Sequence, residues 1–223
     1  MKYVLVHSPF TGPSVWRAAV EAFGRRGLEA QAVRLSPQAA PSYAGLAAAA
    51  AEQAGEGPAV LVVHSGAGGL APAIVGAAGD VFRAVVFVDA VMPHPGRSWF
   101  DTAGNALGAK LRAEAADGAV KSWDRWFPEG ALASLVPEAD REAFLAELAP
   151  TPLAYLDESA PAAEVPAEIA CTYLRLSKVY EDEAAKARQL GWPTLRLDAD
   201  HLAMMTRPDE VVSSVIELTK RLR

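Results

Sequence analysis

The feature that most constrains the fold is an apolar run that ends in a serine and a cluster of glycines. Residues Ala59–Val63 read Ala-Val-Leu-Val-Val, and residues 64–69 (His-Ser-Gly-Ala-Gly-Gly) follow directly. A short apolar run without polar alternation is typical of a strand that is buried on both faces, as in a parallel sheet. The glycines permit a tight turn into a helix. This segment therefore predicts a strand–serine–helix turn at the carboxyl edge of a parallel sheet.

The rest of the chain alternates short strand-like runs with segments of helical periodicity. This rhythm predicts an α/β fold, with a mostly parallel central sheet and helices on both faces. Ser42 is a predicted N-cap of an Ala-rich helix that ends near Gly55, and Thr206 is a predicted N-cap of the last helix, with Pro208 in its first turn. The other predicted strands are Lys2–His7, Ala32–Leu35, Ala84–Asp89, Ile169–Leu176 and Pro193–Leu197.

The alternation is interrupted between residues 91 and 166. This stretch contains Trp99, Trp123 and Trp126, and prolines divide it into short helical pieces. An insertion of this length between sheet elements usually has a function. We therefore expect one domain, residues 1–223, with a helical cap insertion at about 91–166 that covers the site. Some of its aromatic side chains are expected to line an apolar pocket, and we assign Trp126 to substrate contact.

Composition excludes several classes of function. The chain has 223 residues and a net charge of −6 with scattered basic residues, which argues against nucleic-acid or membrane-surface binding. No apolar run approaches the ~18 residues that cross a bilayer, and the N-terminus is a poor signal peptide. The single cysteine, Cys171, fits a reducing compartment and a buried structural thiol. We expect a cytoplasmic, bacterial protein with a small-molecule substrate; a homodimer stays open.

Ser65 and His201 are the residues on which chemistry is expected to depend. A helix that starts at Ser65 directs its free N–H groups and the positive end of its dipole at a developing oxyanion, and Gly66 N–H is the first expected donor. His201 lies after the last predicted strand, so a base follows the serine in chain order. The alternative role for Ser65 is a plain helix N-cap, and for His201 an exposed loop residue.

These motifs together resemble the α/β-hydrolase family over essentially the whole chain. The chain starts at the first strand with no preceding hairpin, which is most similar to the compact branch that contains plant esterases and hydroxynitrile lyases. The resemblance implies the α/β-hydrolase fold and a serine nucleophile with a histidine base. It rests on His7-Ser8 as the turn after the first strand, Trp16, the serine turn at 63–68, and Asp200-His201 followed by residues 207–211.

The sequence departs from the family pattern at three positions. Glycines normally stand two residues on either side of the nucleophile, where this chain has Val63 and Ala67. We therefore expect a relaxed or displaced turn. The loop after the first strand should supply a second oxyanion N–H, yet Pro9 has none. The N–H of Phe10 or the hydroxyl of Ser8 must replace it; hydroxynitrile lyases carry a hydroxyl residue at the place comparable to Ser8.

The acid that orients His201 is the least constrained part of the expected triad. The family usually places it after the strand that ends near Leu176, where this chain reads Ser-Lys-Val-Tyr. Glu181 or Asp182 lies in the next helix, but both are typical of ordinary first-turn acids. Asp89 ends the preceding strand, where some lipases of this fold carry their acid. We favour Asp89 and keep Glu181 or Asp182 as the alternative.

The other histidines have simpler interpretations. His7 and His64 are expected to make structural hydrogen bonds, and His94 is expected at the surface near the cap. The aspartates before His201 lack further ligands at metal-site spacing, so no metal and no cofactor are expected.

Three functions fit these residues. The first is a serine hydrolase of a small, largely apolar ester or thioester that forms an acyl-enzyme on Ser65. The second is a lyase or cyclase that uses His201 as general base while Ser65 and Ser8 orient the substrate. The third is an inactive small-molecule binding protein.

Overall fold

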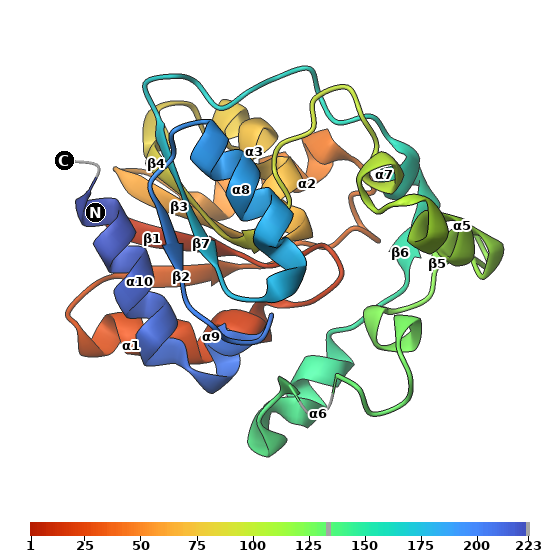
Figure 1. Cartoon of the computed structure of the whole chain (residues 1–223). Helices are drawn as coiled ribbons and strands as arrows, with labels where there is room; N and C mark the ends of the chain where they lie inside the picture. The colour runs from red at the N-terminus through yellow and green to blue at the C-terminus, as the bar shows by residue number, and fades with distance from the viewer. Residues whose placement is uncertain (133–134, 222–223) are drawn as a thin grey trace.

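Parallel strands form the centre of the molecule, as seen in a computed structural model that describes residues 1–132 and 135–221. Within these residues, six strands form one sheet in the order β2-β1-β3-β4-β7-β8 (Figure 1). Every neighbouring pair in this sheet is parallel. The strands are β1 (Lys2–Val6), β2 (Ala30–Val33), β3 (Ala59–Ser65), β4 (Phe82–Ala90), β7 (Ala170–Arg175) and β8 (Thr194–Arg196).

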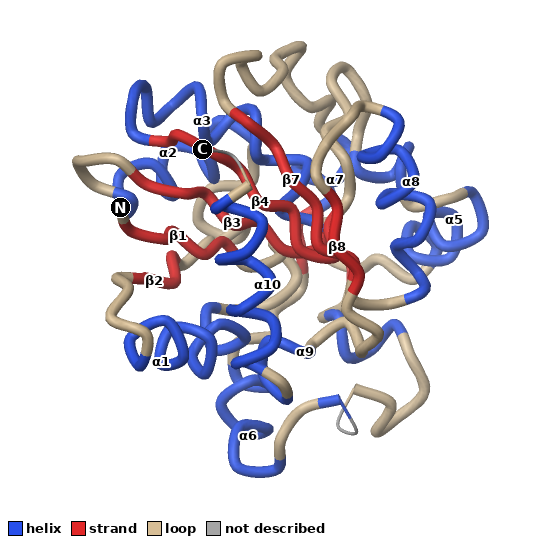
Figure 2. The backbone as a smooth tube through the Cα atoms, turned by 60° about the vertical axis from the view of Figure 1, so that its left-hand side comes forward, coloured by secondary structure: helices blue, strands red, loops and turns tan. Residues whose placement is uncertain are grey.

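Helices cover both faces of this sheet, and Figure 2 shows the strands as a twisted layer between them. One face packs on α2 (Tyr43–Ala54), α3 (Ala71–Ala78) and α8 (Glu181–Gln189). The other face packs on α1 (Arg17–Arg25), α9 (Ala203–Thr206) and α10 (Pro208–Lys220). Among the described helices, none combines the length and apolar character that crossing a membrane requires. The predicted architecture, a mostly parallel central sheet with helices on both faces, is confirmed.

The predicted caps at the two helix ends have opposite outcomes. Ser42 does cap α2, because its Oγ accepts a hydrogen bond from Gly45 N–H at 3.0 Å. The prediction for Thr206 is wrong. Thr206 is the last residue of the short helix α9, and Arg207 precedes Pro208 at the start of α10 without a side-chain cap. The sequence signature of a cap is present, but an additional helical turn from the histidine loop occupies its place.

The segment 91–166, between β4 and β7, is built from short elements. It contacts the sheet body from one side, where α5, α7 and the small sheet β5–β6 lie to the right in Figure 1. Strands β5 and β6 pair antiparallel, through Ala119 with Pro152 and Val120 with Thr151. The elements are α4 (Trp99–Thr102), α5 (Asn105–Ala113), β5 (Ala119–Val120), η4 (Trp123–Trp126), α6 (Glu138–Ala146), β6 (Thr151–Pro152) and α7 (Leu153–Asp157).

The turn after β3 is strained and tightly packed. Ser65 has φ +56°, a left-handed conformation that is uncommon outside glycine, and the 3₁₀ helix η2 (Gly66–Leu70) starts immediately after it. The expectation of a relaxed turn is therefore wrong, although Val63 and Ala67 replace the usual glycines and are fully buried. Close approach is provided instead by Gly68, where a Cβ would lie 1.9 Å from the carbonyl oxygen of Val91.

Remaining short helices connect these elements. The 3₁₀ helix η1 (Pro13–Trp16) leads into α1, η3 (Gly79–Val81) joins α3 to β4, and η6 (Lys178–Tyr180) joins β7 to α8. The turn that contains η6 carries residues that reach back toward the end of β4.

Cys171 on β7 is buried, as the sequence predicts. The residue is 8% exposed, and burial raises the pKa of its thiol to about 12.

We expect Gly68→Ala to destabilise the protein by about 1–3 kcal/mol or more, because the added methyl has no room beside the Val91 backbone. Gly76→Ala is the matched control. Gly76 lies in α3, and a Cβ added there would have nothing within 4 Å, so the substitution should stabilise by about 0.5–1 kcal/mol through helix propensity. Urea unfolding of both variants measures the difference; equal stabilities would contradict the packing argument.

Candidate active site

Three side chains from the ends of three strands form a continuous hydrogen-bonded series. His201 Nε2 lies 3.0 Å from Ser65 Oγ, and His201 Nδ1 lies 2.7 Å from Asp89 Oδ2. Ser65 is the last residue of β3, Asp89 lies at the end of β4, and His201 follows β8. Because these strands are parallel, their carboxyl ends meet at one edge of the sheet. The structure thus brings together the serine, the base and the favoured acid that the sequence predicts.

The serine hydroxyl is not used as a helix cap. It makes no side-chain cap bond to η2, although Ser65 occupies the N-cap position of that helix. Ser65 is 9% exposed, so its hydroxyl is reached from a restricted opening. A strained, left-handed serine whose hydroxyl contacts a histidine is the arrangement that a nucleophile requires.

Asp89 is fully buried and held from several directions. Its Oδ1 accepts hydrogen bonds from the backbone N–H groups of Leu176 and Ser177 at 2.8 and 2.9 Å. Its Oδ2 accepts from Ser177 Oγ at 2.6 Å, besides the contact with His201. Both oxygens of the Asp89 side chain are therefore satisfied as hydrogen-bond acceptors. Asp89 also has φ +44°, at an interruption of the β3–β4 pairing.

The alternative acids lie elsewhere. Glu181 forms ion pairs with Arg175 and Arg188, and the hydrogen bond from Arg188 is the main reason why its pKa is lowered. Asp182 is an exposed residue in the first turn of α8. His201 Nδ1 contacts Asp89 instead, so the structure does not bring Glu181 or Asp182 into the hydrogen-bonded series.

A hydroxyl and an aromatic ring lie beside the first residue of η2. A Cβ at Gly66 would lie 3.1 Å from Ser8 Oγ and 3.3 Å from Phe10 Cε2. Pro9 offers no N–H. Phe10 N–H donates a hydrogen bond to Ser8 Oγ at 3.4 Å. This bond uses a lone pair of the oxygen, so the proton of the Ser8 hydroxyl remains available for donation. The Ser8 hydroxyl and the Phe10 ring therefore border the space beside Gly66, the residue that follows Ser65.

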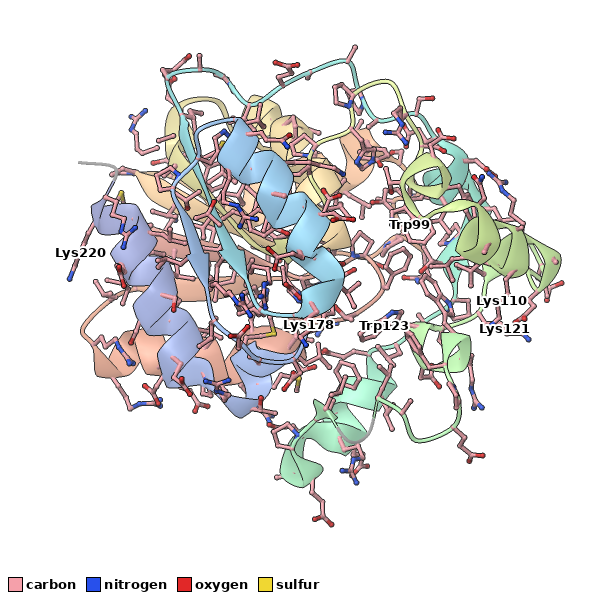
Figure 3. All side chains as sticks on the ribbon, viewed as in Figure 1. Trp99, Lys110, Lys121, Trp123, Lys178 and Lys220 are labelled. Atoms are coloured by element: carbon pink, nitrogen blue, oxygen red, sulfur yellow. The ribbon has the colours of Figure 1, made fainter. Side chains whose placement is uncertain are left out.

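Aromatic side chains of segment 91–166 pack around this space. The Phe10 ring lies 4.9 Å from the ring of Trp99 and 4.8 Å from that of Trp126, so Trp126 reaches the site through Phe10. Trp123, which the sequence does not mark as a site residue, lies edge-on to His201 at 6.1 Å. In Figure 3 the labelled Trp99 and Trp123 lie where segment 91–166 meets the rest of the molecule.

Two site residues have no recognisable signal in the sequence. Ser177 binds Asp89, and Tyr180 Oη lies 3.3 Å from Ser65 Oγ with its ring stacked on His201. Both belong to the turn after β7, which reads as an ordinary polar connection. Only the position of Asp89 and His201 against this turn reveals what the two hydroxyls contact.

Two buried histidines, His64 and His7, form hydrogen bonds with backbone groups of the site and of the strand ends next to it. His64 Nε2–H donates to the backbone carbonyl of His201 at 3.0 Å, and burial keeps the pKa of His64 well below its usual value. His7 Nδ1–H donates to Ser8 O, and its Nε2 accepts from Leu35 N–H. Both therefore make the structural hydrogen bonds expected.

The prediction that His94 lies at the surface is wrong. His94 is 6% exposed, and its Nε2 is paired with the buried hydroxyl of Tyr43.

Comparison with known proteins agrees with this fold. Residues 3–214 match the sequence profile described as the alpha/beta hydrolase family. The chain belongs to the alpha/beta hydrolase family. The prediction of an enzyme of this fold is thereby confirmed at the level of the family. A search of curated protein sequences found no significant relative of this hydrolase.

Solved structures of low sequence identity share the fold along the whole hydrolase chain. An extracellular alpha/beta-hydrolase from a Paenibacillus species, described as homologous in structure and function to tobacco salicylic acid binding protein 2, has a TM-score of 0.79 at 16% identity, with 98% of both chains covered. A pyrethroid hydrolase from Sphingobium faniae has a TM-score of 0.75 at 15% identity, covering 99% of this chain and 97% of the other. Tomato methylketone synthase I bound to 2-tridecanone has a TM-score of 0.73 at 17% identity, with both chains fully covered.

The buried His7 predicts a loss of stability in acid. Burial lowers its pKa from 6.5 to about 4, so the unfolded chain binds the proton more readily than the folded one between these values. Stability is then lost as the pH falls from 6.5 toward 4, by about 3 kcal/mol for this group. Urea unfolding over this range should show a shallower pH dependence for His7→Asn than for the unsubstituted protein. Parallel curves would rule out this contribution.

Proposed function

We propose that the protein is a serine hydrolase that cleaves small, largely apolar esters or thioesters through an acyl-enzyme on Ser65. The observation that carries the proposal is the series of hydrogen bonds from Asp89 through His201 to Ser65. Each member has the chemical type its position requires: a buried carboxylate, an imidazole and a hydroxyl on a strained turn.

The first half of the reaction forms the acyl-enzyme. Asp89 holds the proton of His201 on Nδ1, so Nε2 is free to accept the proton of Ser65. Ser65 Oγ bonds to the carbonyl carbon while the π electron pair moves to the carbonyl oxygen, which becomes the oxyanion. The tetrahedral intermediate then expels the alcohol or thiol, which takes the proton from His201 Nε2. The products of this half are the Ser65 ester and the free leaving group.

The oxyanion requires two donors, and the site offers both. Gly66 is the first residue of η2, so its N–H has no acceptor within that helix, and the Ser8 hydroxyl takes the place of the N–H that Pro9 lacks.

The second half of the reaction hydrolyses the acyl-enzyme in the same way. Water attacks the carbonyl carbon and gives a proton to His201, and this proton returns to Ser65 Oγ as the acid leaves. No step requires a cofactor.

The preference for an apolar substrate follows from the side chains around the oxyanion space. Phe10, Trp99 and Trp126 pack against one another at ring distances of 4.8–5.8 Å. Each is at most 8% exposed, and the ring of Phe10 brings this apolar cluster beside Gly66. A small acyl or alkyl group gains burial there, whereas a charged group loses hydration.

We expect a fluorophosphonate probe to label the folded protein, and Ser65→Ala to abolish the labelling together with ester hydrolysis. We expect intact-mass spectrometry to give one phosphonyl adduct per chain and peptide mapping to place this adduct on Ser65. Clean failure of the folded protein to label would argue against a serine nucleophile. Turnover that survives Ser65→Ala but not His201→Ala would favour the lyase or cyclase, in which the histidine alone acts as base.

Asp89→Asn should reduce kcat by about 10³–10⁴, because an amide no longer fixes the Nδ1–H form of His201. Glu181→Gln is the matched control, since Glu181 is bound to arginines rather than to His201. Its kcat should stay within about twofold of the unsubstituted enzyme. Steady-state hydrolysis of a p-nitrophenyl ester measures both. The reverse pattern would move the acid to Glu181.

A further inference from the structure

Tyr180 contacts the reacting atoms but has no part in the acyl-transfer steps proposed for the triad. It is the last residue of η6, directly after β7. Its Oη lies 3.3 Å from Ser65 Oγ, and its ring stacks on the His201 ring at 5.0 Å with only 3° between the planes. The phenol and the imidazole therefore approach the serine hydroxyl side by side, held parallel to each other.

The protons in the site determine which hydroxyl donates. Asp89 accepts Nδ1–H from His201, so His201 Nε2 is an acceptor and takes the hydroxyl proton of Ser65. With its own proton directed at His201, Ser65 Oγ offers only lone pairs to Tyr180. Tyr180 Oη–H is therefore the donor in the 3.3 Å contact. Burial raises the pKa of Tyr180 to about 12, which keeps this proton in place at neutral pH.

The two sides of Ser65 Oγ have different functions. Gly66 is flanked by Ser8 and Phe10, which form the oxyanion side. The leaving group must lie on the side of His201, because His201 Nε2 delivers its proton. Tyr180 stacks on His201, so its hydroxyl belongs to the leaving-group side.

We propose that Tyr180 is a further catalytic residue that donates a hydrogen bond to the leaving oxygen of an alkyl ester. This inference rests on the proposed serine hydrolase. As the carbon–oxygen bond breaks, its electron pair moves to the leaving oxygen, His201 Nε2 supplies the proton that completes the alcohol, and Tyr180 keeps its own proton throughout. The hydrogen bond stabilises negative charge that develops on that oxygen before proton transfer is complete.

This role points to a substrate class. An alkoxide leaving group is strongly basic, so its departure gains much from a second donor. A p-nitrophenolate spreads its charge over the ring and gains little. The site is therefore suited to esters of simple aliphatic alcohols. With activated aryl esters, the contribution of the Tyr180 hydroxyl to the rate should disappear.

The test compares two esters of the same acid, ethyl butanoate and p-nitrophenyl butanoate, in the unsubstituted enzyme and in Tyr180→Phe. Phenylalanine keeps the ring that stacks on His201 and removes only the hydroxyl. We expect kcat/KM for the ethyl ester to fall about 10- to 100-fold, the range for a hydrogen bond to a charged group, and that for the p-nitrophenyl ester to fall less than about threefold. The ratio of the two constants does not depend on the fraction of folded enzyme.

Val179→Ala is the matched control, because Val179 is the preceding residue and is 85% exposed; its ratio should equal that of the unsubstituted enzyme. An equal loss for both esters, or no loss for the ethyl ester, would overturn the role of Tyr180 and leave the serine hydrolase intact. If the unsubstituted enzyme hydrolyses neither ester and takes no fluorophosphonate, the proposed function itself fails.

Discussion

The buried carboxylate of Asp89 is the group on which the arrangement of the site depends. It lies at the end of β4 and accepts hydrogen bonds from the turn after β7 and from the loop after β8. A single fully buried residue therefore fixes the relative positions of three chain segments that are far apart in sequence. A buried carboxylate is costly unless every nearby polar group donates to it, and here both oxygens receive donors. Its left-handed backbone is the strain that this placement requires.

The position of Asp89, the proposed acid, on β4 changes what the turn after β7 can do. In the arrangement that the family resemblance suggests, that turn would carry the acid. Here Ser177 occupies the turn and donates to Asp89 instead. The same turn then brings Tyr180 against His201 and Ser65. The imidazole of His201 is thus packed against the rings of Tyr180 and His64, which lie 5.0 and 4.4 Å away, and both contacts restrict the orientation of this imidazole.

The sequence predicts the scaffold better than the details of the site. Parallel strands of continuous apolar residues and a serine between a strand and glycines are local patterns, so Ser65 and the sheet can be read from the chain. Asp89 can be favoured because carboxyl ends of parallel strands share an edge. The strain at Ser65 cannot be read in this way, because the close approach is made at Gly68 against Val91, a contact between the segments that follow β3 and β4. Ser177 and Tyr180 escape prediction for the same reason: their partners are 88 and 115 residues away in sequence.

All three groups of the hydrogen-bonded series, and Tyr180 with them, lie at the end of a sheet strand or in the turn that follows one, whereas the described part of segment 91–166 contributes three tryptophan rings that pack beside Phe10 and His201. Two of the three rings that would contact an acyl group, those of Trp99 and Trp126, therefore lie in a different stretch of chain from the groups that would perform the chemistry. Bond cleavage and the choice of acyl group can then change independently, because replacing Trp99 or Trp126 alters the shape offered to an acyl group and removes no member of the series. In such a molecule, a new preference for the acyl group can arise from substitutions within one continuous stretch of chain.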